Sequence, residues 1–289
     1  MAATQIARVE ADGVDVFYRH AGREDAPTIV LLHGYPSSSH MYRNLIPHLA
    51  TKYRVIAPDL PGYGFTTVPD SLNYKYTFAN LSKTFAAFMD ALGLKRFAIY
   101  IFDYGAPTGL RFALNRPDAV AAIITQNGNA YVEGFGKSFW QPIEKYWATG
   151  APEDREALRS ATTLEATKWQ YIDQAANPEA IQPEGYYLDQ ALMDRPGNKD
   201  IQLDLFYDYR TNVELYPKFQ EYFRNSSVPV LAIWGKKDSI FVYPGAEAYR
   251  RDVKKFELHW LDSGHFALET NEVEVAKEID GFLTKYGVF

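Results

Sequence analysis

The chain has 289 residues, of which 47% are hydrophobic and 23% are charged, and its formal net charge at pH 7 is -6. This composition is that of an ordinary globular protein, and the length suits one large α/β domain or a domain with an insertion. The lack of cysteine excludes disulfides, thiolate catalysis and cysteine-ligated metals. The acidic balance, with no basic stripe, argues against nucleic acid and anionic membranes as partners.

No stretch of the chain approaches the ~20 consecutive apolar residues of a membrane-spanning helix, and its beginning lacks the apolar segment of a signal peptide. We therefore expect a cytoplasmic protein with no membrane partner. The 21 Tyr, 18 Phe and 5 Trp fit either a large core or an aromatic pocket for a small ligand. The sequence does not decide the oligomeric state and leaves a homodimer open.

The first half of the chain alternates between strand-like and helix-like segments. Short apolar runs or alternating patterns predict strands at 14–20, 28–32, 54–57, 96–102 and 120–126. Apolar residues at helical spacing predict helices at 38–50, with a kink at Pro47, at 78–94 and at 105–117. This alternation indicates a mostly parallel sheet with helices on its faces.

After residue 130 the pattern changes to segments rich in Tyr, Trp, Gln and charged residues, with no strong strand signal. Helices are predicted here at 137–148, 152–175, 183–194 and 211–224. The α/β pattern then returns, with strands at 228–235 and 256–261 and helices at 245–253 and 272–286. We expect a core domain formed by residues 1–130 and 225–289, with residues 131–224 inserted as a helical cap.

Three chemically capable side chains follow the predicted strands. Asp103 follows strand 96–102, and Asp238 and His265 follow the two strands of the last part of the chain. In open parallel sheets ligands bind beyond the carboxyl ends of the strands, so these residues are expected to meet at one edge. Their order along the chain is nucleophile, acid, histidine. This is the order of the triad in α/β-hydrolases, whose nucleophile lies on a sharp turn between strand and helix.

The chain resembles the α/β-hydrolases over nearly its full length. HGYP (33–36) resembles their oxyanion loop and DLPGYG (59–64) their D-x-x-G-x-G loop. GKKDSI (235–240) resembles the acid loop and DSGHF (262–266) the histidine loop. Each motif is weak alone, but four in the right order predict the fold: a mostly parallel central sheet flanked by helices, with an inserted helical cap.

The strand-to-helix turn departs from the G-x-S-x-G pattern of that family. Ile101 stands at the first Gly position and Asp103 at the Ser position, whereas Gly105 is kept. An Asp nucleophile is typical of the branch that contains epoxide hydrolases and haloalkane dehalogenases. The resemblance implies that Asp103 attacks a carbon atom and forms an alkyl ester. Water activated by His265, which Asp238 orients, would then hydrolyse this ester.

The same resemblance assigns supporting roles around the nucleophile. The backbone N–H groups of Tyr35 and Tyr104 are expected to form the oxyanion hole. His33, Gly34 and Pro36 are expected to shape the oxyanion loop, with a cis peptide bond before Pro36. No His, Asp or Glu set has metal-ligand spacing, so we expect neither a metal nor another cofactor.

The residues around Asp103 favour an epoxide over a halide as substrate. Haloalkane dehalogenases typically carry Trp after the nucleophile and Asn in the oxyanion loop, where this chain has Tyr104 and Tyr35. FYDYRTN (206–212) resembles the epoxide hydrolase segment that ends in Tyr-Arg, which makes Tyr209 the candidate proton donor, with core packing as its alternative role. A second donor tyrosine has no clear counterpart in 138–147.

The resemblance therefore implies an epoxide-hydrolase-like enzyme that uses water and a small apolar or amphipathic organic substrate. A haloalkane dehalogenase is the alternative, and an indole N–H of Trp140, Trp147 or Trp169 directed at Asp103 would favour it. Two further interpretations remain open: an atypical natural-product hydrolase, and a non-catalytic ligand-binding member of the fold.

Overall fold

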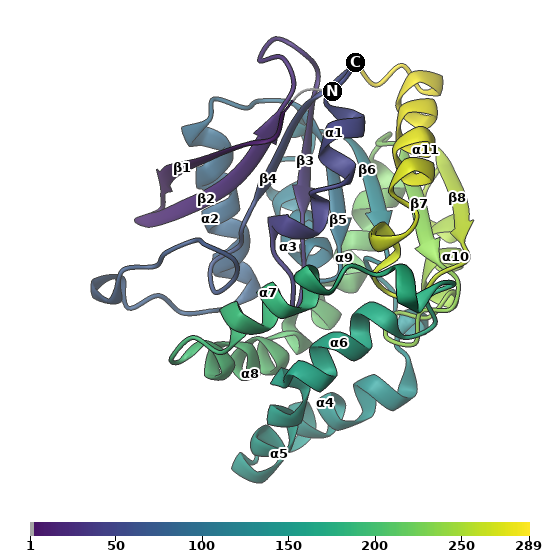
Figure 1. Ribbon diagram of the computed structural model, residues 1–289. Helices are drawn as coiled ribbons and strands as arrows, with labels where there is room; N and C mark the ends of the chain where they lie inside the picture. Colours follow the sequence, from purple (N-terminus) through teal and green to yellow (C-terminus); the bar gives the residue numbers. More distant parts are fainter. Residues whose placement is uncertain (1–2) are drawn as a thin grey trace.

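The computed structural model describes residues 3–289 of the chain (Figure 1). Its apolar segments build one sheet. The strands are β1 (Gln5–Ala11), β2 (Val14–Ala21), β3 (Thr28–Leu32), β4 (Arg54–Pro58), β5 (Phe97–Phe102), β6 (Val120–Gln126), β7 (Val230–Gly235) and β8 (Phe256–Leu261). Their order across the sheet is β1-β2-β4-β3-β5-β6-β7-β8. The strands from β3 to β8 run parallel, and β1 and β2 form an antiparallel edge. The predicted mostly parallel sheet is confirmed.

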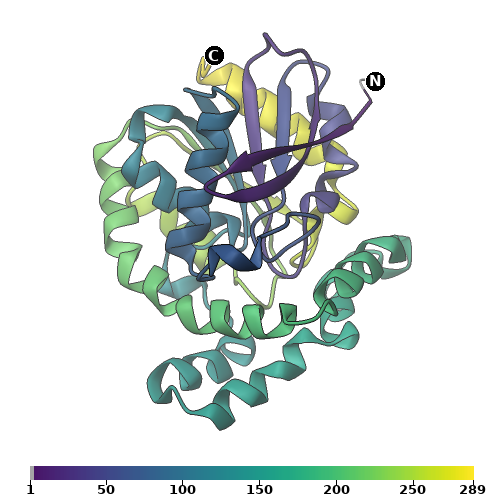
Figure 2. The ribbon, with the colours of Figure 1, turned by 90° about the vertical axis from the view of Figure 1, so that its left-hand side faces the viewer.

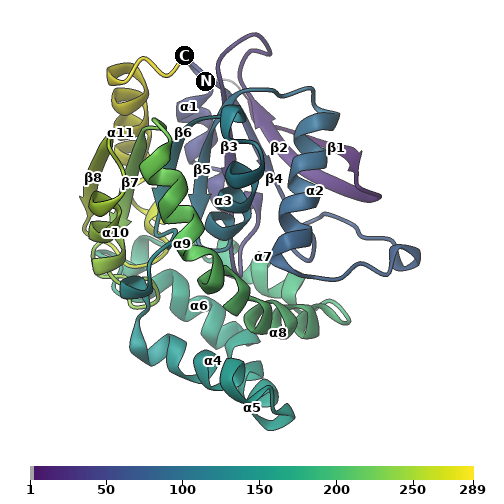
Figure 3. The same ribbon diagram turned by 180° about the vertical axis from the view of Figure 1, so that it is seen from behind.

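The helices of the described chain either pack against the two faces of this sheet or form the predicted cap. They are α1 (Leu45–Leu49), α2 (Phe78–Ala91), α3 (Gly105–Asn115), α4 (Lys137–Thr149), α5 (Pro152–Ala157), α6 (Leu164–Ile172), α7 (Pro183–Met193), α8 (Asn198–Asp208), α9 (Arg210–Asn225), α10 (Pro244–Ala248) and α11 (Glu272–Lys285). Helices α1 and α11 lie on one face (Figure 1), and α2, α3 and α9 lie on the other (Figure 3). No helix within residues 3–289 has the length and hydropathy needed to cross a membrane.

The central strand β5 is buried along its whole length because it packs against helices on both sides. Successive side chains of a strand point to opposite faces. Phe97, Ile99 and Ile101 therefore join the apolar cluster on one face, whereas Tyr100 and Phe102 join the cluster on the other. This double burial fixes the direction in which the strand delivers the residue that follows it, Asp103.

The predicted cap segment, residues 131–224, lies between β6 and β7. Helices α4 to α8 gather at one end of the molecule, beyond the carboxyl ends of the parallel strands (Figure 2). Helix α9 leads from this layer back along the sheet domain (Figure 3). The cap helices therefore cover the edge at which the candidate site residues are expected.

Two predicted helices are shorter than expected. Residues 38–50 form a 3-10 turn, capped by the Ser38 hydroxyl, and then α1. Pro47 lies in the first turn of α1, where a missing N–H costs nothing. The predicted helix 152–175 is divided into α5, a 3-10 segment and α6, because the Thr163 side chain caps a new helix.

Three other elements differ from the prediction. Strand β1 was not expected, because it is a largely exposed edge strand without a clear apolar face. Helix α8 was also not expected; its apolar residues do not form a regular stripe. The helix predicted at 245–253 is shorter, since α10 passes into a 3-10 turn at Tyr249.

Candidate active site

Asp103 lies on a sharp turn between β5 and α3. Its φ of +47° is in the left-handed region that few residues other than glycine adopt. The residue is 5% exposed. Helix α3 begins two residues later at Gly105, where a Cβ atom would collide with the Leu32 carbonyl. The turn therefore presents a carboxylate at the end of the central strand, as a nucleophile requires.

The two oxygens of the Asp103 carboxylate have different surroundings. Oδ1 accepts a hydrogen bond from the Tyr35 backbone N–H, at 2.7 Å, and the Tyr104 N–H also stabilises the ionised carboxylate. Oδ2 lies 3.8 Å from Nε2 of His265. The oxyanion loop can lie this close to Asp103 because residue 34 is glycine: a Cβ atom there would collide with the Asp103 side chain. Oδ1 is thus held by the Tyr35 N–H, and Oδ2 faces the histidine.

His265 is held by a second carboxylate behind it. Its Nδ1 donates to Oδ2 of Asp238 at 2.7 Å. The same oxygen accepts from the Asn127 side chain at 2.6 Å, and Oδ1 of Asp238 accepts from the Ile240 N–H at 2.7 Å. These bonds fix the Nδ1–H tautomer. Nε2, by contrast, is buried and finds no hydrogen-bond partner among residues 3–289.

Burial and charge shift the protonation equilibria of this group. Burial raises the pKa of the Asp103 carboxyl to about 6, although His265 and the Tyr35 and Tyr104 N–H groups oppose the shift. Burial alone would lower the pKa of His265, but Asp238 outweighs it, with a smaller contribution from Asp103, so this pKa is raised. Around neutral pH the arrangement therefore favours an ionised Asp103 beside a histidine that readily holds a proton.

The loop that carries Tyr35 is fixed by buried contacts. The peptide bond between Tyr35 and Pro36 is cis, as predicted. The Leu60 N–H donates to Nε2 of His33 at 2.9 Å, and Nδ1 of His33 lies 3.1 Å from the Gly34 carbonyl oxygen. Burial lowers the pKa of His33. A neutral His33 thus joins the oxyanion loop to the loop after β4.

Tyr209 reaches the site from the cap side. It lies between α8 and α9 and is fully buried. Its ring centroid is 5.7 Å from that of Tyr104 and 4.7 Å from that of Trp140. Its hydroxyl oxygen is 3.1 Å from the hydroxyl oxygen of Tyr216, which also accepts from the Asn129 side chain at 3.3 Å. The candidate donor is therefore part of a buried polar chain in an otherwise aromatic wall.

Sequence reasoning missed Tyr216 and the role of Asn127. Tyr216 is seven residues after Tyr209, a spacing that places both on one face of a helix, and this spacing could have identified it. Asn127 directly follows β6. Its contact with Asp238 joins β6 to the loop after β7, and local sequence carries no signal for such a contact.

Two of the three candidate tryptophans direct their indole N–H groups at backbone carbonyls and not at Asp103. The Trp140 indole N–H donates to the Ile240 carbonyl at 2.9 Å, and that of Trp147 donates to the Phe206 carbonyl at 2.7 Å. Trp169 is 37% exposed, whereas Asp103 is buried. The indole N–H groups of Trp140 and Trp147 are therefore not directed at Asp103, as a dehalogenase would require.

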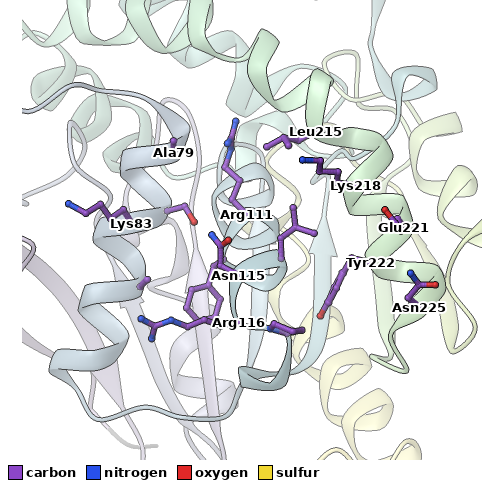
Figure 4. Close-up of a pocket in the computed structure, with 15 residues that line it drawn as sticks. Ala79, Lys83, Arg111, Asn115, Arg116, Leu215, Lys218, Glu221, Tyr222 and Asn225 are labelled. Atoms are coloured by element: carbon purple, nitrogen blue, oxygen red, sulfur yellow. The ribbon is translucent and has the colours of Figure 1, made fainter.

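A groove of about 810 Å³ lies elsewhere, between α2, α3 and α9 (Figure 4). Arg111 and Lys218 are among its lining residues, and Asp103, Asp238 and His265 are not. Within the described residues 3–289, no group of three or more His, Asp or Glu side chains could hold a metal ion. The buried Asp103 cluster is thus the place where the chain concentrates reactive groups.

Comparison with known proteins gives consistent matches. The family model for the alpha/beta hydrolase fold matches residues 27–272. An uncharacterized hydrolase of Saccharomyces cerevisiae, YNR064C, is 48% identical over 271 residues, which cover 93% of this chain and 93% of that protein.

Two solved structures share the fold at low sequence identity. The epoxide hydrolase CorEH has a TM-score of 0.81 at 20% identity, covering 98% of this chain and 100% of its own. The haloalkane dehalogenase DbeA from Bradyrhizobium elkani has a TM-score of 0.80 at 20% identity, covering 99% of both chains. Because the two match almost equally, the path of the backbone does not distinguish their chemistries.

Proposed function

The chain belongs to the alpha/beta hydrolase fold family, and we propose that it is a hydrolase that opens epoxides through a covalent ester on Asp103. The proposal depends most on one observation: the cap tyrosine Tyr209 packs against Tyr104, the residue after Asp103, whereas the indole N–H groups of Trp140 and Trp147 are bonded to backbone carbonyls. We further propose that the substrate is small and apolar or amphipathic, since aromatic rings surround the buried carboxylate.

The first step is attack by Oδ2 of Asp103 on an epoxide carbon. A carboxylate is ionised above its pKa and needs no base to become a nucleophile. Oδ1 is held by the Tyr35 N–H at 2.7 Å, which leaves Oδ2 free to attack. The C–O bond of the ring breaks, and the ring oxygen keeps its electron pair and takes a proton from Tyr209. The product of this step is an alkyl ester of Asp103.

The second step is hydrolysis of the ester. Nε2 of His265 takes a proton from water, and the resulting hydroxide adds to the carbonyl carbon of the ester. The oxyanion forms on Oδ1, which already accepts a hydrogen bond from the Tyr35 N–H, and the Tyr104 N–H is the proposed second donor; one such donor contributes roughly 3–4 kcal/mol in other enzymes. The acyl C–O bond then breaks, and the diol leaves with the proton from His265. Asp103 is released as the acid and loses the second proton of the water to solvent, and Tyr209 recovers its own proton from solvent.

The charge of Asp103 explains why His265 acts as a base only after Asp103 has been alkylated. The negative charge of Asp103 helps His265 to hold a proton in the free enzyme. Alkylation removes that charge, so it lowers the affinity of His265 for the proton. The histidine is thereby made available as a base at the stage at which the ester needs water.

Halide displacement is the second candidate, since the fold is shared with DbeA and an Asp nucleophile serves both reactions. Halide departure calls for N–H donors in an apolar cradle, and two of the three candidate indoles are bonded to backbone carbonyls. Epoxide opening calls for an O–H donor, which Tyr209 can supply. The hydroxyl chemistry of the wall therefore favours the epoxide.

The test uses His265→Gln protein, in which alkylation can proceed but hydrolysis cannot. After incubation with a panel of epoxides and haloalkanes, intact-mass spectrometry is expected to detect a gain equal to one whole epoxide, mapped to Asp103. The double variant Asp103→Asn/His265→Gln is the matched control and should gain nothing. Adducts from haloalkanes alone would establish the dehalogenase. No adduct from either class would indicate another substrate or a ligand-binding protein.

A further inference from the structure

Tyr104, the residue after the nucleophile, carries a hydroxyl group that the protein leaves unsatisfied. Its side chain is 2% exposed, and within residues 3–289 its hydroxyl has no hydrogen-bond partner. A buried polar group without a partner costs free energy, so native proteins rarely keep one without a reason. Phenylalanine would fill the same space without this cost.

The place of the ring suggests what the hydroxyl serves. Its centroid lies 4.8 Å from that of Phe78, 5.7 Å from that of Tyr209 and 6.0 Å from that of Tyr35. It therefore stands between the oxyanion loop, which holds the carboxylate, and the cap tyrosine. The hydroxyls of both neighbours are engaged: Tyr209 with Tyr216 at 3.1 Å, and Tyr35 with the Ala161 carbonyl at 2.7 Å. Of the hydroxyl groups of Tyr35, Tyr104 and Tyr209, only that of Tyr104 has no hydrogen-bond partner among residues 3–289.

We propose that the Tyr104 side chain is the second hydroxyl donor to the ring oxygen of the epoxide, beside Tyr209. This inference rests on the proposed function and assigns the donor for which the cap sequence offered no clear counterpart. One donor then comes from the core, one residue from the nucleophile, and the other from the cap.

In this step the ring oxygen receives one proton and one hydrogen bond. When Oδ2 of Asp103 attacks, the breaking C–O bond leaves its electron pair on the ring oxygen. That oxygen takes the phenolic proton of Tyr209 and accepts a hydrogen bond from Tyr104, and the hydrogen bond also disperses the developing charge. Burial raises the pKa of both phenols, so both carry their protons at neutral pH.

The matched control is Tyr42, whose hydroxyl is also buried and without a partner in the described part of the chain. Tyr42 belongs to the apolar cluster on the opposite face of the sheet from that of Tyr104. Tyr42→Phe and Tyr104→Phe therefore remove the same atom from buried apolar surroundings, but only Tyr104 directly follows Asp103 in the chain and packs against Tyr209.

The experiment measures the single-turnover rate of Asp103 alkylation by styrene oxide in three proteins: His265→Gln alone, and His265→Gln with Tyr104→Phe or with Tyr42→Phe. Tyr104→Phe is expected to slow alkylation on the order of 10²-fold, and Tyr42→Phe to leave it unchanged. Neither variant should lower the unfolding temperature, because neither hydroxyl is bonded within the protein. Loss of rate together with retained stability separates a chemical role from a structural one.

Two results would overturn the inference in different ways. If Tyr104→Phe forms the adduct at the rate of the His265→Gln parent, Tyr104 is not a donor, and the proposed function stands. If the parent itself forms no adduct with styrene oxide or with the other epoxides of the panel, the proposed function fails and the inference fails with it.

Discussion

In the proposed mechanism, the sheet domain and the helical cap contribute different chemistry to the same buried site. The sheet domain supplies Asp103, Asp238 and His265 from the ends of β5, β7 and β8, and backbone N–H groups orient two of them. The cap supplies Tyr209 and Tyr216, which are held mainly by one another and by aromatic packing. In this division of roles, residues of the sheet domain form and hydrolyse the ester, whereas residues of the cap stabilise the leaving oxygen. Variants in each region should affect different steps.

The largest difference between the effects on the two steps, alkylation and ester hydrolysis, is expected from Asp238→Asn. This change keeps the size of the side chain but removes the charge that orients His265 and raises its pKa. Hydrolysis of the ester should slow by a factor on the order of 10³–10⁴, whereas alkylation should be nearly unchanged. Rapid-quench kinetics with mass detection would then show the ester accumulating during turnover. Equal slowing of both steps would mean that Asp238 acts on the core site as a whole.

A smaller effect, on the opposite step, is expected from Tyr209→Phe. Removing this hydroxyl should slow epoxide alkylation on the order of 10²-fold and leave the hydrolysis rate of a formed ester unchanged. Tyr216→Phe should act in the same direction but more weakly, because its hydroxyl contacts Tyr209 and not the substrate in this account. Stopped-flow measurement of both steps provides the check. A slowed hydrolysis step in either variant would contradict the division between core and cap.

The smallest effect is expected from a change of pH. It acts on the alkylation rate through the ionisation of Asp103, which belongs to the sheet domain. Only the ionised carboxylate attacks, and burial raises the pKa of Asp103 to about 6. Alkylation should therefore be nearly constant above pH 7 and fall as the pH drops through 6, by roughly tenfold between pH 7 and pH 5. The single-turnover rate of alkylation measured against pH tests this expectation. An acid midpoint near 4 would show that the carboxylate is not desolvated.

The sequence was informative for the core and much less so for the cap. Buried parallel strands such as β5 and β6 are continuous apolar runs, and polar residues at their ends mark the edge where Asp103 lies. The cap lacks such a constraint, so α8 was not expected and the segment 152–175 was predicted as one helix. The pairing of Tyr209 with Tyr216 and the unsatisfied Tyr104 hydroxyl depend on contacts between elements, which local patterns do not encode.

Oxygen-18 labelling during a single turnover tests most directly whether Asp103 forms an ester. Excess enzyme in H₂¹⁸O would be mixed with an epoxide, and the Asp103 peptide and the diol would be weighed after one turnover. Attack by Oδ2 and hydrolysis at the carboxyl carbon predict that the label enters Asp103, while the first diol carries an unlabelled oxygen from the enzyme. A labelled diol with an unlabelled Asp103 would mean that water attacks the epoxide directly, and would contradict the account.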